Sequence, residues 1–93
     1  MIKSFHGKET EKLFNRQPSS KLPPDIRRAA LKKLFYLDAA DLLGDLKVAP
    51  GNRLERLSGS REGQYSIRVN DQWRICFRWH QGDAYDVEIT DYH

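Results

Sequence analysis

The last three residues, Asp91, Tyr92 and His93, are of types that can carry out proton-transfer chemistry. An unperturbed imidazole titrates near neutral pH, so His93 is a candidate general acid or base. A phenol such as that of Tyr92 can stack on a nucleic-acid base or donate to a phosphate oxygen. Terminal residues are also often frayed and without function, so the residue types alone do not assign a role here.

Arginines form the second group of chemically competent side chains. The chain has a net charge of +3, and residues 52–93 contain six arginines but no lysine. A planar guanidinium matches a phosphate or a carboxylate with two parallel hydrogen bonds, which an ammonium cannot do. The sequence therefore favours an anion site in its second half, with surface ion pairs as the alternative.

The stretch from residue 64 to residue 79 alternates apolar and polar side chains on both sides of a short turn. This pattern predicts an antiparallel hairpin with an apolar face and an uncovered face that carries Arg68, Arg74 and Arg78. In a tight hairpin Arg68 and Arg74 lie near each other across the strands. Two such cations fit either a bound anion or the carboxylates of Asp86 and Glu88 on the next strand.

Composition and length restrict the class of protein. With 31% charged and 39% hydrophobic residues, the chain is typical of one soluble globular domain, residues 1–93. The single cysteine, Cys76, excludes an internal disulfide and a cysteine metal site, and it fits a reducing cytoplasm. No membrane-spanning segment or signal peptide is recognisable. We therefore expect a cytoplasmic protein with no membrane partner, no metal and no cofactor.

The first half of the chain predicts a short strand followed by helices. Residues 2–5 fit a strand and residues 8–14 a helix. Pro24 suits the first turn of a longer helix, whose apolar stripe is Ile26, Ala30, Leu34 and Leu37. Asp38 is expected to cap one further helical turn over residues 39–43.

The second half predicts only strands. A strand over residues 54–57 precedes the hairpin, and a last strand follows a turn at residues 80–83. Alternation places Tyr85, Val87 and Ile89 on the core side of that last strand. The element order β-α-α-β-β-β-β predicts an α+β fold, with helices covering one face of a mostly antiparallel sheet.

Several motifs along the chain resemble the RelE/ParE toxin superfamily, most closely its HigB type with the GraT-like members. They are Pro50–Gly59, Gly63–Ile67, Asn70–Arg74 and Asp91–His93, with Met1–Phe5 and Leu37–Ala40 similar to the family's first strand and helical segment. The resemblance implies a RelE-like fold with two N-terminal helices on a curved sheet. It also implies the toxin of a type II toxin–antitoxin pair.

The activity that the resemblance implies is metal-independent cleavage of mRNA in the ribosomal decoding site. It further implies neutralisation by a cognate helix-turn-helix antitoxin, through which the toxin would reach operator DNA indirectly. Where some relatives have His-Pro-Leu-Lys-Gly, this chain has Glu55–Gly59 and so lacks that histidine and lysine. Either Glu55 is then the partner of His93, or catalysis depends on positioning and charge.

The resemblance and the chemistry together select two groups of site residues. The candidate catalytic residues are Glu55, Arg74, Asp91, Tyr92 and His93. The candidate substrate-binding residues are Arg56, Arg61, Arg68 and Arg78.

A binding module is the alternative from another functional class. It would be a ParE-like inhibitor of DNA gyrase, or a toxin relic that binds only its antitoxin. Arg74 and His93 favour the nuclease, because a pure binder needs no titratable group at the end of the chain.

Overall fold

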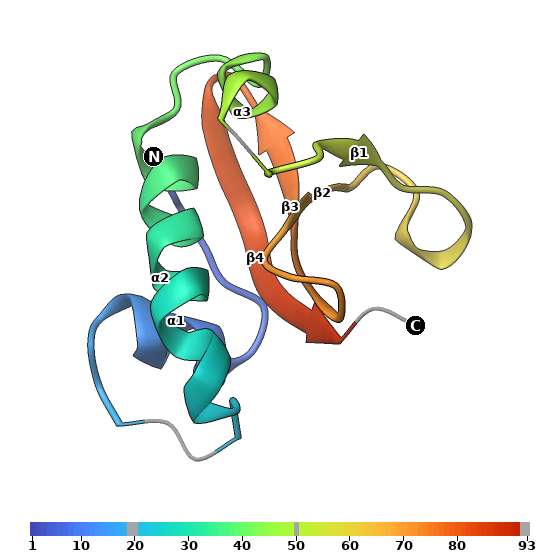
Figure 1. Ribbon diagram of the computed structural model, residues 1–93. Coiled ribbons are helices and arrows are strands. Elements are labelled where there is room, and N and C mark those ends of the chain that lie inside the picture. Colours follow the sequence, from blue (N-terminus) through green and yellow to red (C-terminus); the bar gives the residue numbers. More distant parts are fainter. Residues whose placement is uncertain (19–20, 50, 92–93) are drawn as a thin grey trace.

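The computed structural model describes residues 1–18, 21–49 and 51–91, and in it helices pack on one side of an antiparallel sheet (Figure 1). The helices are α1 (Lys8–Phe14), α2 (Pro24–Ala39) and α3 (Asp45–Val48), with a 3-10 turn η1 (Gly59–Arg61). The strands lie in the order β1 (Glu55–Arg56), β2 (Tyr65–Arg68), β3 (Trp73–His80) and β4 (Asp83–Asp91). The predicted α+β class is confirmed.

The long helix α2 follows from its apolar spacing. Its four buried residues are those of the predicted stripe, and Pro24 occupies its first turn. In the described ranges, no helix has both the length and the apolar character that crossing a membrane requires.

The predicted helical turn over residues 39–43 is wrong. The helix ends at Ala39 because Ala40 adopts an extended conformation, with ψ of 129°. The Asp38 carboxylate accepts a hydrogen bond from the backbone N–H of Ile2 at 2.9 Å instead of capping a new turn. The backbone N–H groups of Asp41 and Leu42 are satisfied by the Asp45 carboxylate, at the start of α3.

The predicted first strand forms only two isolated parallel bridges to β4, Ile2 with Ala84 and Phe5 with Val87. Between these bridges the Ser4 hydroxyl accepts a hydrogen bond from the backbone N–H of Asp86 at 2.9 Å. Asp86 has a φ of 53°, which strand residues do not adopt. The interruption of the strand therefore coincides with an irregularity in β4.

This irregularity is a β-bulge. Cys76 pairs with Glu88 and Arg78 with Tyr85, so one β3 residue lies opposite two β4 residues. As a result the buried β4 residues are Ala84, Val87 and Ile89, which do not share one uninterrupted alternation. Tyr85 is only partly buried and lies outside the core cluster, so its predicted core position is wrong.

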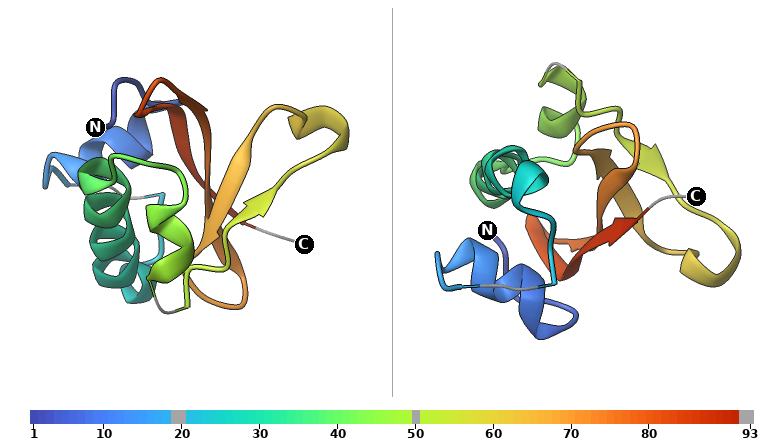
Figure 2. Two further views of the ribbon diagram at one scale, coloured as in Figure 1. Left: turned by 90° about the horizontal axis from the view of Figure 1, so that it is seen from above. Right: turned by 60° about the horizontal axis from the view of Figure 1, so that its bottom comes forward.

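The main core lies between α2 and the sheet, where the largest fully buried side chains include Phe77, Leu34 and Ile75. The opposite face of the sheet is not uncovered as predicted. Arg74 is only 7% exposed there, and Ser66 and Cys76 are also buried. The chain that leads to β1 covers Arg74, whose guanidinium donates to the Arg53 carbonyl at 2.8 Å. The β1–β2 arm, residues 55–68, projects away from the helices (Figure 2).

Asn52 anchors the covering segment. Its side chain is 1% exposed, and its amide donates to the Leu46 carbonyl at 3.2 Å and accepts from the Lys33 ammonium. Its backbone carbonyl accepts from the N–H of Arg68. Burial, together with the charges of Lys32 and Arg68, lowers the pKa of Lys33. Asn52 therefore joins α2 and α3 through its side chain and β2 through its backbone carbonyl.

Replacing Asn52 by alanine should lower the free energy of unfolding by about 1–3 kcal/mol for each polar group left buried without a partner. Urea denaturation followed by tryptophan fluorescence measures the change. The neighbouring variant Arg53→Ala, whose side chain is exposed, should stay within about 0.5 kcal/mol of the wild type. Equal losses in the two variants would show that Asn52 is no anchor.

Candidate active site

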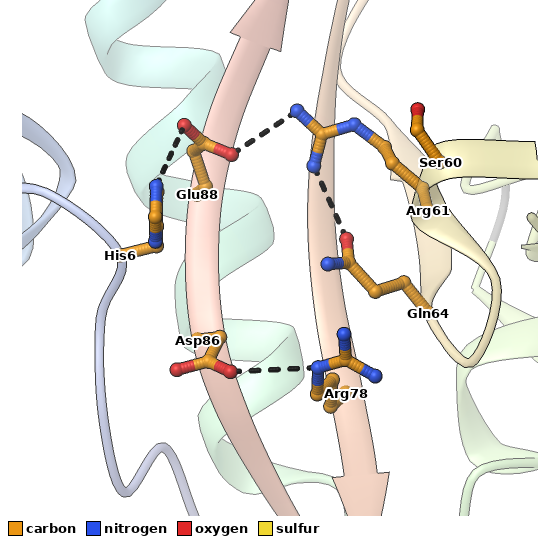
Figure 3. A pocket seen from close by; sticks show the side chains of 7 residues that line it. All are labelled: His6, Ser60, Arg61, Gln64, Arg78, Asp86 and Glu88. Atoms are coloured by element: carbon orange, nitrogen blue, oxygen red, sulfur yellow. Dashed lines mark hydrogen bonds and ion pairs between the residues drawn. The ribbon is translucent and has the colours of Figure 1, made fainter.

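Two adjacent cavities lie on the face of the sheet that points away from the helices. The first, called the Glu55 cavity, has a volume of about 450 Å³ and is lined by Glu55, Arg56, Leu57, Ser58, Ser60, Arg61, Cys76, Thr90 and Asp91. The second, called the Glu88 cavity, has a volume of about 400 Å³ and is lined by His6, Ser60, Arg61, Gln64, Arg78, Asp86 and Glu88 (Figure 3). Both are in the range of ligand sites.

Four predicted site residues share the Glu55 cavity, namely Glu55, Arg56, Arg61 and Asp91. Arg78 lines the Glu88 cavity, and Arg61 lines both. In the described part of the chain, Arg68 and Arg74 line neither of them. Tyr92 and His93 lie outside the described residues, although Asp91, which precedes them in the sequence, is a lining residue.

The Arg74 guanidinium is nearly buried and fully engaged. Its Nε donates to the Ser66 hydroxyl at 2.7 Å, and its Nη2 donates to the Arg53 carbonyl at 2.8 Å. Its Nη1 lies 3.8 Å from the Glu55 carboxylate, whose side chain is 50% exposed. Arg74 thus holds a carboxylate that faces the Glu55 cavity.

The predicted neighbourhood of Arg68 and Arg74 is confirmed, since they are direct cross-strand partners. The alternative in which Asp86 and Glu88 are their partners is wrong. Arg68 pairs with Asp71 in the turn, and Arg74 pairs with Glu55. Asp86 and Glu88 pair with Arg78 and Arg61 in the Glu88 cavity.

The arginines that line the cavities are held in different ways. Arg56 lies over the Tyr65 ring, 5.8 Å from its centre, and contacts no carboxylate among the described residues within ion-pair distance. Arg61 donates to Gln64 at 3.1 Å and to Glu88 at 3.2 Å. Of the two arginines that line the Glu55 cavity, Arg56 is therefore the one without a carboxylate partner among the described residues.

Asp91 is fixed at the rim of the Glu55 cavity, where its carboxylate accepts a hydrogen bond from Gln72 at 3.1 Å. Gln72 belongs to the turn between β2 and β3. The end of β4 is therefore tied to the hairpin turn, as expected for residues that form one site.

Sequence reasoning missed Cys76 and Thr90 as residues of this site. Both line the Glu55 cavity, and both share the strand face of Arg74. Burial raises the pKa of the Cys76 thiol. The nearby Thr90 hydroxyl acts in the opposite direction and lowers the pKa of Cys76. Among the described residues, the Thr90 Oγ1 atom is buried without a hydrogen-bond partner of ordinary geometry. The alternation of β3 was the signal that could have identified Cys76.

Within residues 1–18, 21–49 and 51–91, no three acidic, histidine or cysteine side chains are arranged so that they could hold a metal ion. The polar side chains of the Glu55 cavity are instead two carboxylates, two guanidinium groups, hydroxyls and a thiol. Such a set can exchange protons with a ligand and balance the charge of a phosphate.

Removing the Arg74 side chain should destabilise the protein far more than removing its neighbour Arg56. Arg74→Ala leaves the Ser66 hydroxyl and the Arg53 carbonyl without their donor, which costs about 1–3 kcal/mol. Arg56→Ala removes an exposed side chain and should change the free energy of unfolding by at most about 0.5 kcal/mol. Urea denaturation compares the two, and a stable Arg74→Ala variant would refute the structural role.

Alkylation of Cys76 by iodoacetamide should be slow in the native protein at pH 7–8. The raised pKa leaves little thiolate, which is the reactive form, so the rate should rise only at a higher pH than in the unfolded chain. Mass spectrometry of native and urea-unfolded samples measures both rates. Identical rates at pH 8 would contradict this expectation.

Comparison with known proteins assigns the family. A family model described as the RelE-like toxin of the type II toxin–antitoxin system HigB matches residues 3–93. The chain is 41% identical over 90 residues to Toxin HigB-1 of Vibrio cholerae, covering 96% of this chain and 95% of that protein. It is 38% identical over 93 residues to Endoribonuclease HigB of Proteus vulgaris, covering 100% of both.

Solved structures agree on the fold. A chain of the heterotetrameric YoeB–YefM toxin–antitoxin complex from Staphylococcus aureus superimposes with a TM-score of 0.60 and 17% identity, covering 100% of this chain and 98% of that one. A second YoeB–YefM structure from the same organism gives a TM-score of 0.56. The predicted RelE-like fold is confirmed, and the chain belongs to the HigB-like family of RelE-like toxins of type II toxin–antitoxin systems.

Proposed function

We propose that this toxin is an endoribonuclease that cleaves mRNA in the decoding site of the ribosome. One observation carries the proposal: in a chain of the HigB-like family, Glu55, Arg56, Arg61 and Asp91 line a single cavity of about 450 Å³. A relative that is 38% identical is named Endoribonuclease HigB.

The proposed reaction is attack of a ribose 2′-hydroxyl on the adjacent phosphorus. A base removes the 2′-hydroxyl proton as the new P–O bond forms, and an anionic phosphorane results. The bond to the 5′-oxygen then breaks while an acid donates a proton to that leaving oxygen. The site must therefore supply a base, an acid and positive charge.

Glu55 is the proposed base, because it is exposed to the cavity and held by the buried Arg74 guanidinium. Arg56 stabilises the phosphorane, an effect worth about 3 kcal/mol for a well-aligned donor. Arg61, Arg68 and Arg78 contact the flanking RNA backbone. In this assignment Arg74 is a positioning residue rather than a phosphate ligand.

The remaining roles rest on the resemblance of the last residues to the family. His93 is the proposed acid, and Tyr92 stacks on a base at the scissile bond. Asp91, which is held by Gln72, fixes the chain directly before them.

Ribosome dependence follows from the small number of proton-transfer groups. One carboxylate and one imidazole are weak catalysts unless the substrate is held in the reactive geometry, which the ribosome provides. The toxin would act in the cytoplasm, where ribosomes translate.

The further proposed partners of the toxin are a cognate helix-turn-helix antitoxin and, through the complex with that antitoxin, operator DNA.

Cleavage of ribosome-bound mRNA should fall by about 10²–10⁴-fold in His93→Ala and in Glu55→Gln, because each loses one proton-transfer group. His80→Ala is the matched control, since this exposed histidine at the end of β3 lines neither cavity. Single-turnover cleavage of mRNA on purified ribosomes gives the rates.

Naked mRNA should be cut much more slowly than ribosome-bound mRNA. Equal rates on the two substrates would refute ribosome dependence. Absence of cleavage by the wild type, combined with inhibition of DNA supercoiling by gyrase, would replace the nuclease with the ParE-like binding module.

A further inference from the structure

The Glu88 cavity contains a connected row of polar contacts that the proposed reaction does not use (Figure 3). The Glu88 carboxylate lies 3.2 Å from Arg61 Nη2 on one side and 4.0 Å from His6 Nε2 on the other. Arg61 also donates to Gln64 at 3.1 Å. Glu88 is thus the counter-ion of the one arginine that lines both cavities.

A second ion pair in the same cavity serves as an internal comparison. Arg78 Nε lies 3.5 Å from the Asp86 carboxylate. Asp86 and Glu88 are on the same strand and face the same cavity, but Asp86 pairs with an arginine that does not line the Glu55 cavity. The two carboxylates therefore hold different arginines, Asp86 from the bulge of β4 and Glu88 from the regular strand after it.

The Arg61–Glu88 pair is accessible to a ligand. The Arg61 side chain is 35% exposed and that of Glu88 29% exposed. Ion pairs exposed to this degree are weak. Glu88 accepts from Nη2 of Arg61, while Nη1 donates to Gln64, and a phosphate oxygen can accept the Nη2 hydrogen bond as a carboxylate oxygen does. A phosphate can therefore replace Glu88 on Arg61 without loss of hydrogen bonding.

The shape and charge of the cavity limit what the ligand can be. Two arginines and two carboxylates balance to zero, which suits a group with a single negative charge and does not suit a polyanion such as a nucleoside triphosphate. Gly63 leaves space here, since a Cβ on it would lie 2.8 Å from Arg78 Nη1. A volume of about 400 Å³ accommodates one nucleotide.

We propose that the Glu88 cavity binds the nucleotide of single-stranded RNA that flanks the scissile bond, and that its phosphate displaces Glu88 from Arg61. Glu88 is then an internal counter-ion that occupies Arg61 until substrate arrives. The inference rests on the proposed nuclease function, because it places the flanking nucleotide beside the Glu55 cavity.

The test measures binding of a six-nucleotide RNA that carries a 2′-deoxy sugar at the cleavage position, so that it cannot react. Glu88→Gln removes the competing charge and keeps the side-chain shape. It should tighten binding about fivefold, the order expected for an exposed ion pair. The slope of log K against log salt should be the same for the wild type and Glu88→Gln, because the phosphate contacts Arg61 in both proteins. Fluorescence anisotropy at several salt concentrations gives both quantities.

Asp86→Asn is the matched control, since it removes one negative charge from the same strand and asparagine tolerates the φ of 53°. Both variants are also made in an Arg61→Ala background. In that background Glu88→Gln should tighten RNA binding no more than Asp86→Asn does. The change in affinity caused by Asp86→Asn should be the same with and without Arg61. The inference would be overturned if Glu88→Gln tightened RNA binding as much in the Arg61→Ala background as in the wild type. It would also be overturned if, with Arg61 present, Glu88→Gln tightened binding no more than Asp86→Asn does.

Cleavage on ribosomes separates this inference from the function on which it rests. If the wild type cleaves mRNA but Glu88→Gln binds RNA no more tightly than Asp86→Asn, only the counter-ion role is refuted. If the wild type does not cleave although the Arg61-dependent difference in binding is found, the nuclease function is refuted and the RNA-binding site stands.

Discussion

The burial of one positive charge organises the second half of this toxin. A guanidinium removed from water must be surrounded by acceptors, because an unpaired buried charge is far more costly than a lost surface contact. Arg74 finds its acceptors in Ser66, in the Arg53 carbonyl and in Glu55. The chain before β1 must therefore lie across the sheet, and it leads directly into Glu55 and Arg56, which line one side of the Glu55 cavity.

The same crossing explains why a two-residue strand is sufficient. β1 pairs with β2 only through Glu55 with Ser66 and Arg56 with Tyr65. Arg74 and Asn52 hold the chain just before this pairing, so the short strand needs no long ladder of its own. The rest of the β1–β2 arm extends past the sheet edge and contributes Ser60 and Arg61 to both cavities (Figure 2).

The predictable parts of the fold are those that depend on local periodicity. The α2 stripe and the hairpin register follow from which side chains must avoid water, and the Arg68–Arg74 pairing follows from the short turn. The partner of Arg74 could not be predicted in this way. Glu55 is 19 residues away, and two acids on β4 had equally suitable spacing. Only the three-dimensional course of the chain distinguishes them.

The candidate site shows the same division. Glu55, Arg56, Arg61 and Asp91 were selected from sequence and line one cavity, while the catalytic roles of the two acids and the substrate-binding roles of the two arginines stay predictions. Cys76 and Thr90 were missed because neither residue type signals a site by itself. The burial of Arg74 was missed because a polar position in an alternating strand normally faces solvent.

The bulge in β4 means that this strand is one residue longer than its alternation requires. If Asp86 is left out of the count, the side chains of β4 alternate regularly between the two faces. Ala84 and Val87 then point inward, and Tyr85 and Glu88 point outward. The extra residue thus adds a carboxylate and a bend and leaves the two faces of the strand in place. A loss of one residue at this point would change the docking of Ser4 but would not exchange inside for outside, so strand length here can vary among relatives without rebuilding the core.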